Sequence, residues 1–119
     1  SPFTPKRFFV VDRVPPGGGR GGHAHFENRQ FFVAVSGNLM CVVDDGHRAF
    51  AVRLSAPSIG LYVPPLVWGI QYGHSAEAAL LVLASNSYDP KDYAADYGAF
   101  RQLTRSPDSR ATDNLGGLL

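Results

Sequence analysis

Residues 30–54 have the sequence QFFVAVSGNLMCVVDDGHRAFAVRL, three short apolar runs separated by two glycine-containing turns. Short runs that are rich in Val and Phe and bounded by Gly, Asn or Asp are typical of β-strands. The expected strands are Gln30–Val35, Leu39–Asp44 and Ala49–Leu54. Both separators, Ser36-Gly37-Asn38 and Asp45-Gly46, are interpreted as hairpin turns, because Gly and Asn tolerate a positive φ.

The chain on both sides of this segment follows the same pattern up to Ser85. Further apolar runs, each bounded by Gly, Pro, Ser or His, are Arg7–Val14, Gly60–Pro64, Val67–Tyr72 and Ala78–Ser85. Six or seven short strands at such close spacing are typical of a β-sandwich or β-barrel. The body of the chain is therefore predicted to be all-β.

The pattern changes after Asn86. Asp89-Pro90 has the features of a helix start, a capping carboxylate followed by a proline at the first helical position. Apolar side chains then recur at helical spacing, at Tyr93, Tyr97, Phe100 and Leu103. We expect one C-terminal amphipathic helix that begins there and packs on the strands. The predicted organisation is a single domain over residues 1–104 followed by a flexible tail over residues 105–119.

Composition excludes several classes of function. The 119 residues carry a net charge of +1, and 18% of them are charged, so there is no basic field to hold a nucleic acid. The longest apolar run, Ala78–Ala84, is far shorter than the roughly 20 residues that a membrane-spanning helix needs. A single cysteine, Cys41, lies within a strand-like run, which fits a buried thiol in a reducing compartment. The expected location is the cytoplasm.

The densest chemical signal is Arg20-Gly21-Gly22-His23-Ala24-His25. Residues i and i+2 of a strand face the same side, so both imidazoles are expected to share one cavity. Glycines allow a ligand to approach the backbone, and the planar guanidinium of Arg20 suits a phosphate or a carboxylate.

A metal site is one interpretation of this motif, because His-x-His followed by a carboxylate resembles the first motif of the cupins. The expected carboxylate position holds Gln30, and Gly69 stands where the later cupin histidine is expected. His74 could substitute, whereas His47 lies in a turn. Since two imidazoles alone hold a metal weakly, we predict no metal and no cofactor. Neutral imidazoles free of metal suit proton transfer next to a carbonyl group.

Longer motifs resemble one cupin family. RGGHAHFENRQ is followed by Gly37, by the Asp44–Gly46 turn, by GLYVPPLVW at residues 60–68 and by LVLASNSYDPKDYAADYGAF at residues 81–100. Together they look like the WxcM-like 3,4-ketoisomerases that act on dTDP- (also written TDP-) linked 4-keto-6-deoxyhexoses. The resemblance covers about Pro5 to Phe100.

The resemblance implies a cupin-type jelly-roll barrel, a homodimer, and a metal-independent shift of the keto group from C4 to C3 through an enediol. By position, His23 and His25 would be the acid/base pair, and Arg20 would bind the sugar or the pyrophosphate. Gln30, Tyr62 and Trp68 would contact the substrate, although ordinary core packing explains these three equally well. Capping and packing explain the family's residues in the helical segment, so we assign these a structural role: Tyr88, Asp89, Asp92, Tyr93, Asp96 and Tyr97.

Two other classes of function stay open at this point. A non-catalytic cupin module could bind a nucleotide sugar or a partner enzyme. A metal-dependent cupin oxygenase would bind a transition metal through His23 and His25. The intact Arg20, His23 and His25 favour the isomerase over the binding module.

Overall fold

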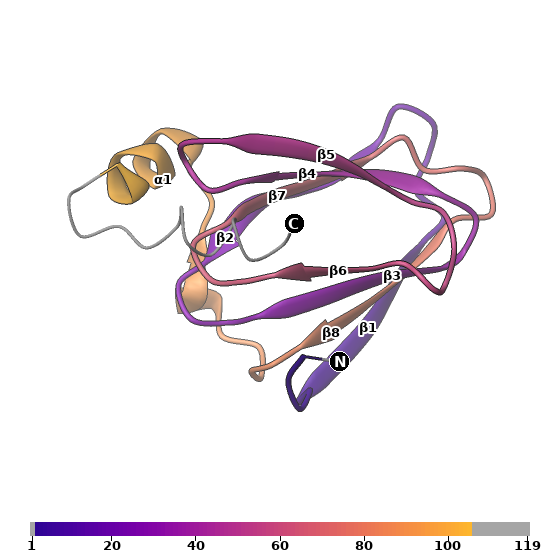
Figure 1. The fold of residues 1–119 in the computed structure, drawn as a ribbon, viewed down its shortest axis with the longest axis horizontal. Coiled ribbons are helices and arrows are strands. Elements are labelled where there is room, and N and C mark those ends of the chain that lie inside the picture. Colours follow the sequence, from indigo (N-terminus) through magenta and orange to yellow (C-terminus); the bar gives the residue numbers. More distant parts are fainter. Residues whose placement is uncertain (1, 106–119) are drawn as a thin grey trace.

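The computed structural model describes residues 2–105, which form two facing β-sheets with a short helix at one end (Figure 1). The first sheet contains, in spatial order, β1 (Arg7–Asp12), β8 (Ala79–Ala84), β3 (Gln30–Ser36) and β6 (Gly60–Val63). The second contains β5 (Ala49–Leu54), β4 (Leu39–Asp44), β7 (Trp68–Tyr72), β2 (Gly19–His25) and β9 (Tyr93–Ala94). Of the predicted tail, residues 105–119, only Arg105 is described, and the residues after it lie outside the described part of the chain.

This arrangement is a jelly-roll sandwich. The strand pairs of residues 2–105 are antiparallel, and none of them joins the first sheet to the second. The predicted all-β jelly-roll class with one C-terminal helix is therefore confirmed, although the sheets stay open at their edges instead of closing into a barrel. Within residues 2–105 no helix is long and apolar enough to cross a membrane.

The two turns that the sequence pattern marks behave differently. Asp45-Gly46 joins the paired strands β4 and β5, as predicted. The hairpin expected at Ser36-Gly37-Asn38 is wrong, because this turn carries the chain from β3 in the first sheet to β4 in the second. Gly37 has a φ of +63°, and a Cβ there would lie 2.8 Å from the backbone of Ala78. Crossing between the sheets lets both apolar runs face one core.

Strand alternation builds that core. The inward-facing side chains of β3 and β4 are Phe32, Ala34, Leu39, Cys41 and Val43. They pack against inward residues of the neighbouring strands, Leu54, Leu61, Val63, Leu80 and Val82. Burial raises the pKa of the Cys41 thiol to about 12, so the single cysteine is a buried structural group, as expected.

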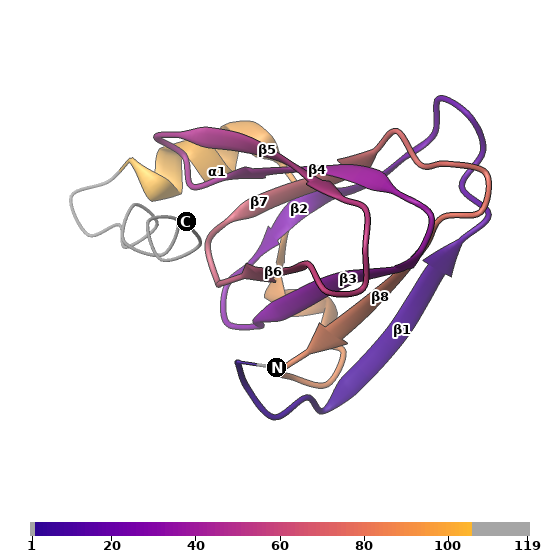
Figure 2. The same ribbon diagram turned by 45° about the vertical axis from the view of Figure 1, so that its right-hand side comes forward.

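The C-terminal segment begins differently from the prediction. Asp89 caps only a single 3₁₀ turn, Pro90–Asp92, by accepting a hydrogen bond from the backbone N–H of Lys91. Strand β9 follows and pairs with β2, and helix α1 (Tyr97–Thr104) starts only after its cap, Asp96. The predicted start at Asp89 is therefore wrong, because pairing with β2 extends the chain at Tyr93. Figures 1 and 2 show α1 beside the β4–β5 turn, where Arg105 donates to the carbonyl of Gly46.

Candidate active site

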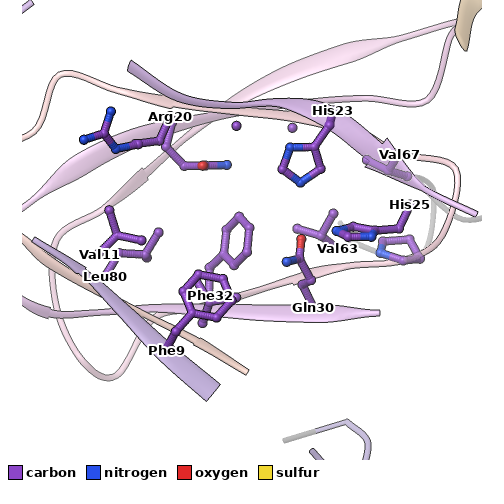
Figure 3. Close-up of a pocket in the computed structure, with 15 residues that line it drawn as sticks. Phe9, Val11, Arg20, His23, His25, Gln30, Phe32, Val63, Val67 and Leu80 are labelled. Carbon is purple, nitrogen blue, oxygen red and sulfur yellow. The ribbon is translucent and has the colours of Figure 1, made fainter. Parts of the chain in front are cut away.

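A cavity of about 200 Å³ lies between the two sheets (Figure 3). This space is large enough to hold several water molecules. The second sheet lines the cavity with Arg20, Gly21, His23, His25, Gly69 and Gln71. The first sheet lines it with Phe9, Val11, Gln30, Phe32, Val63, Leu80 and Val82. The cavity is therefore apolar on one side and carries most of its polar groups on the other.

Strand β2 carries both histidines into this cavity. The register between β2 and β7 shifts between Gly21 and His23, where Gly21 and Gly22 have φ values of +91° and +78°. Only glycine adopts such values readily, so the glycines of the motif form the bulge that aims the next residues. The rings of His23 and His25 lie 5.0 Å apart and nearly perpendicular. The i, i+2 spacing thus places both imidazoles in one cavity, as predicted.

Asp92 holds one of these imidazoles. Its Oδ2 lies 3.1 Å from Nδ1 of His25, and the side chains are 12% and 6% exposed. A carboxylate can only accept, so Nδ1 carries the proton and Nε2 keeps its lone pair. Among residues 2–105 this Nε2 has no hydrogen-bond partner, although it is buried. The geometry presents a free basic nitrogen at the cavity wall.

Backbone amides keep Asp92 in place. Its Oδ1 accepts from the N–H of Glu27 at 2.8 Å, and its Oδ2 accepts from the N–H of Asn28 at 3.0 Å. Asn28 in turn accepts from the N–H of Asn86 and from the hydroxyl of Ser85. This network ties the loop after β2 to the segment after β8, so the orientation of His25 depends on residues more than sixty positions away in sequence.

Burial keeps both imidazoles neutral at neutral pH. It lowers the pKa of His23, and the neighbouring His25 lowers it further. Burial also lowers the pKa of His25, an effect that the hydrogen bond to Asp92 opposes without reversing. The ring of Tyr93 lies 4.9 Å from that of His23 and 4.5 Å from that of His25, which adds to their burial. A neutral imidazole is the form that accepts a proton.

Arg20 and Gln30, both predicted to bind substrate, also border the cavity. Figure 3 shows Arg20 at the opposite end from His25, and the amide of Gln30 pointing into the space below the histidines. Arg20 is exposed, and its guanidinium donates only a long hydrogen bond of 3.3 Å to the carbonyl of Gly19. Gln30 is 7% exposed.

Tyr62 and Trp68 lie elsewhere, so the prediction that they contact substrate is not supported by their positions. Leu61 and Val63 point inward, so strand alternation turns Tyr62 to the outer face of the first sheet, where its ring lies 6.3 Å from that of Phe3. Trp68 is on the outer face of β7 and packs under α1, 5.5 Å from the ring of Phe100. Both positions match the ordinary packing that we weighed against binding.

The described part of the chain offers no group of three or more His, Cys, Asp or Glu side chains that could hold a metal. His47 is exposed and contacts the carbonyl of Thr104 through its Nε2. His74 does not line the cavity, and Gln30 supplies an amide where a cupin metal site has a carboxylate. Resident metal therefore does not fit the residues around His23 and His25.

Sequence reasoning missed two residues of the site. Asp92 and Tyr93 were assigned a structural role, yet the first bonds to His25 and the second covers both imidazoles. The pairing that brings them there, His25 opposite Tyr93 and Ala24 opposite Ala94, is a long-range contact. The DPKDY segment could be recognised in the sequence, but only the antiparallel pairing of β9 with β2 shows that it lies opposite the histidines.

Comparison with known proteins shows which family the chain resembles over most of its length. The family model FdtA: WxcM-like, C-terminal, matches residues 1–105. The TDP-4-oxo-6-deoxy-α-D-glucose-3,4-oxoisomerase of Aneurinibacillus thermoaerophilus is 35% identical over 101 residues, which are 85% of this chain and 73% of that protein.

Solved structures show the same similarity. WlaRA, a TDP-fucose-3,4-ketoisomerase from Campylobacter jejuni, has a TM-score of 0.84 and 33% identity, covering 86% of this chain and 76% of that one. A histidine-to-asparagine variant of the 3,4-ketoisomerase QdtA from Thermoanaerobacterium thermosaccharolyticum, in complex with TDP-4-keto-6-deoxyglucose, has a TM-score of 0.87 and 29% identity, covering 91% and 78%. The resemblance predicted from the motifs is confirmed, and the chain belongs to the FdtA, WxcM-like C-terminal family.

Proposed function

We propose that this chain is a sugar-nucleotide 3,4-ketoisomerase, which moves the keto group of a TDP-4-keto-6-deoxyhexose from C4 to C3. The observation that carries the proposal is the pair of neutral imidazoles in one cavity, one of them held by a carboxylate with its other nitrogen free. Relatives named as 3,4-ketoisomerases support the substrate class.

The chemistry requires only proton transfers. A base removes the C3 proton, which the adjacent C4 ketone makes acidic, and the electron pair of that bond forms the C3–C4 double bond. The π pair of the C4 carbonyl moves to its oxygen, which takes up a proton, and the product is an enediol. Return of a proton to C4, with loss of the proton from the C3 hydroxyl, leaves a ketone at C3 and a hydroxyl at C4. Since one C–H bond breaks and one forms, the sugar is neither oxidised nor reduced overall, and no redox cofactor is required.

His25 is suited to be one of the two proton-transfer groups. Its Nε2 has a lone pair because Asp92 fixes the proton on Nδ1. When Nε2 takes a proton, the carboxylate stabilises the resulting imidazolium. General acid–base catalysis of this kind contributes about 10²–10⁴-fold to the rate.

His23 is suited to be the second group. With ring centroids 5.0 Å apart, two imidazolium charges would repel each other, so at most one ring is an imidazolium at a time. Both rings are neutral before the reaction, and the ring that takes the C3 proton becomes the imidazolium while the other stays neutral.

Arg20 and Gln30 would bind the substrate around this pair. The guanidinium of Arg20 is exposed at the far end of the cavity, where it can pair with the diphosphate outside the enclosed space. The buried amide of Gln30 is within the cavity and would hydrogen-bond the sugar.

The direct test follows the C3 proton. Purified protein is mixed with TDP-4-keto-6-deoxyglucose in deuterated water and followed by proton NMR. We expect loss of the C3 signal and appearance of a 3-keto product, with the configuration at C4 read from its couplings. A spectrum identical to an enzyme-free control, with the nucleotide sugar still bound, would instead favour the non-catalytic binding module.

We also propose that the enzyme is a homodimer that forms through the outer face of the first sheet. Cross-strand register places apolar residues in two rows over this face, Phe8–Leu83–Phe31–Tyr62 and Val10–Leu81–Val33–Gly60. Phe8 and Val10 are 72% and 52% exposed. Antiparallel sheets commonly have one apolar and one polar face, so a sheet that is apolar on both faces favours a covered outer surface. A second copy would cover it symmetrically.

Light scattering after size exclusion tests the dimer. We expect a dimer mass for the wild type and a monomer mass for Val10→Arg, because a charge on an exposed strand position disturbs an interface more than it disturbs folding. Ile70→Arg, on the outer face of the second sheet, is the matched control and should stay dimeric. A monomeric wild type at tens of micromolar would contradict this proposal.

A cytoplasmic location completes the proposal. The buried free thiol of Cys41 supports this location, because thiols stay reduced in a reducing compartment such as the cytosol. Fractionation of the source cells tests this location. We expect the protein in the cytoplasmic fraction, and its presence in the membrane or secreted fraction would contradict the proposal.

A further inference from the structure

A second buried glutamine faces the cavity from the sheet opposite Gln30. Gln71, in β7, is 8% exposed and lines the cavity together with its neighbour two positions earlier, Gly69. Sequence reasoning gave it no role. Among residues 2–105 it is the one amide side chain on the cavity wall that also carries His23 and His25.

The amide of Gln71 has no hydrogen-bond partner within residues 2–105, and the same is true of the amide of Gln30. A primary amide has two donor hydrogens and an acceptor oxygen, and burying it without partners destabilises a protein. Neither amide belongs to the fully buried polar groups that lack a partner in residues 2–105, so their polar atoms remain accessible from the cavity, where a ligand or water can bond them. The two amides are therefore directed at whatever occupies the cavity.

The bare backbone of two glycines borders this amide, and at one of them, Gly21, a side chain would crowd it. A Cβ at Gly21 would approach Oε1 of Gln71 to 3.0 Å and Nε2 to 3.3 Å, and a Cβ at Gly69 would lie 3.6 Å from Nε2. The amide thus packs against bare backbone, at the bulge that aims His23. Its position is set by the same glycines that shape the motif of β2.

Strand register locates Gln71 along the wall. Gln71 is the partner of Arg20, and Gly69 is the partner of His23. Because the amide lies against both Gly21 and Gly69, it sits between the level of Arg20 and the level of the histidines. A molecule that reaches from the guanidinium to the imidazoles must pass over it.

We propose that Gln71 is a specificity-determining residue, whose amide hydrogen-bonds the oxygens of the hexose ring that lie between the diphosphate and the carbon atoms facing the histidines. This inference rests on the proposed isomerase function. The oxygens between C1, which bears the diphosphate, and the reacting carbons C3 and C4 are the C2 hydroxyl and the ring oxygen. A primary amide can donate to either of them and can also accept from the hydroxyl. A site built to bond a hydroxyl discriminates strongly against ligands that lack it. Free TDP, which lacks the hexose, makes none of these bonds.

The variant Gln71→Met tests the proposal, because methionine has similar length and no amide. We expect kcat/KM on TDP-4-keto-6-deoxyglucose to fall at least about tenfold, while the Kd for TDP stays within about twofold of the wild-type value. The melting temperature should stay near the wild-type value, since the amide that is removed makes no hydrogen bond that holds the fold. A purely structural amide would behave in the opposite way, with a lower melting temperature and weaker TDP binding.

Ile70→Met is the matched control, because Ile70 is the next residue in β7, faces away from the cavity and is 38% exposed. It should keep wild-type kcat/KM. Wild-type kcat/KM in Gln71→Met, or a melting temperature lowered by several degrees together with weaker TDP binding, would overturn the proposal.

Failure of the isomerase function is distinguishable from failure of this inference. If the wild type itself gives no turnover, the affinities of both proteins for TDP-4-keto-6-deoxyglucose and for TDP are measured by calorimetry. Gln71→Met should then lose affinity for the sugar nucleotide and not for TDP. Equal losses, or no loss for either, would overturn the role of Gln71.

Discussion

The two ends of the cavity are built in different ways. At one end His25 is buried and bonded to Asp92, whose oxygens are held by backbone N–H groups of a loop tied to the segment after β8. At the other end Arg20 is exposed, on a glycine-rich stretch, with one long hydrogen bond to the preceding carbonyl.

The difference matches the proposed division of work. Proton transfer requires an imidazole of defined tautomer and orientation, which a network of buried hydrogen bonds supplies. Pairing with a diphosphate at the surface requires a charge that can adjust, and a long exposed side chain supplies that. Substitutions at the two ends should therefore change different kinetic parameters.

The largest effect is expected for His25→Asn. Removing the imidazole should lower kcat by about 10²–10⁴-fold, the usual contribution of a general acid or base. The wall of a polar cavity tolerates this change, so the melting temperature and the Kd for TDP should stay near the wild-type values. Stopped NMR assays measure kcat, and turnover close to wild type would show that His25 does not transfer the proton.

Asp92→Asn should have the next largest effect, lowering kcat by about 10–100-fold with little change in KM. The asparagine amide can donate to Nδ1 of His25, which moves the imidazole proton to Nε2 and removes the lone pair from the cavity. The acid limb of the pH–rate profile should shift as well, because the carboxylate that raises the pKa of His25 is lost.

Asp89→Asn is the control for this variant. Asp89 caps the same 3₁₀ turn but bonds to the N–H of Lys91 and not to a histidine. If Asp89→Asn lowered kcat and shifted the pH profile as Asp92→Asn does, the role of Asp92 would be structural only.

Arg20→Ala should have a smaller effect, confined to binding. We expect KM to rise several-fold with kcat nearly unchanged, because an exposed ion pair contributes about 0.2–1 kcal/mol and a charge-assisted bond to phosphate somewhat more. The rise should shrink at high salt, which screens exposed charges. An unchanged KM at low salt would place the diphosphate elsewhere.

The smallest expected effect concerns the dependence of stability on pH. The pKa values of His23 and His25 are lowered in the folded state from the ordinary histidine value of 6.5. Just below pH 6.5 these two residues therefore bind more protons in the unfolded chain than in the folded protein. Stability should be fully present above pH 6.5 and should decrease as the pH falls toward the folded-state pKa values. His74, also lowered by burial and by Arg20, acts in the same direction.

Melting temperatures between pH 8 and pH 5 measure this dependence. The double variant His23→Gln/His25→Gln should show a shallower decrease than the wild type, and the remaining slope would report on His74. A wild-type melting temperature that is flat or rises toward acid pH would contradict the direction of these shifts.

Local patterns in the sequence predicted much of this molecule because they follow from short-range geometry. The apolar runs form strands at nearly the expected bounds, and the i, i+2 spacing of His23 and His25 places both imidazoles on one wall. The same alternation places Tyr62, which lies between the inward-facing Leu61 and Val63, on the outer face of the sheet, so strand alternation favoured ordinary packing over substrate contact for this residue.

What local patterns could not supply are partners that are distant in sequence. Whether a turn joins paired strands or crosses between sheets depends on which core the next run fills, so Gly37 and Gly46 look alike in the sequence and differ in the fold. The helix start expected at Asp89 was overridden by the pairing of Tyr93 with His25, a contact that no helical periodicity reveals.

By itself, the sequence determined the strand-rich body, the pair of histidines on one face of a strand, and the family, because these depend on the alternation and identity of neighbouring residues. Only the tertiary structure decided that Asp92 orients His25, that Gln71 faces the cavity, and that Tyr62 and Trp68 do not. Those relations arise from strand register between segments far apart in the chain, where a shift by one residue moves every side chain to the opposite face.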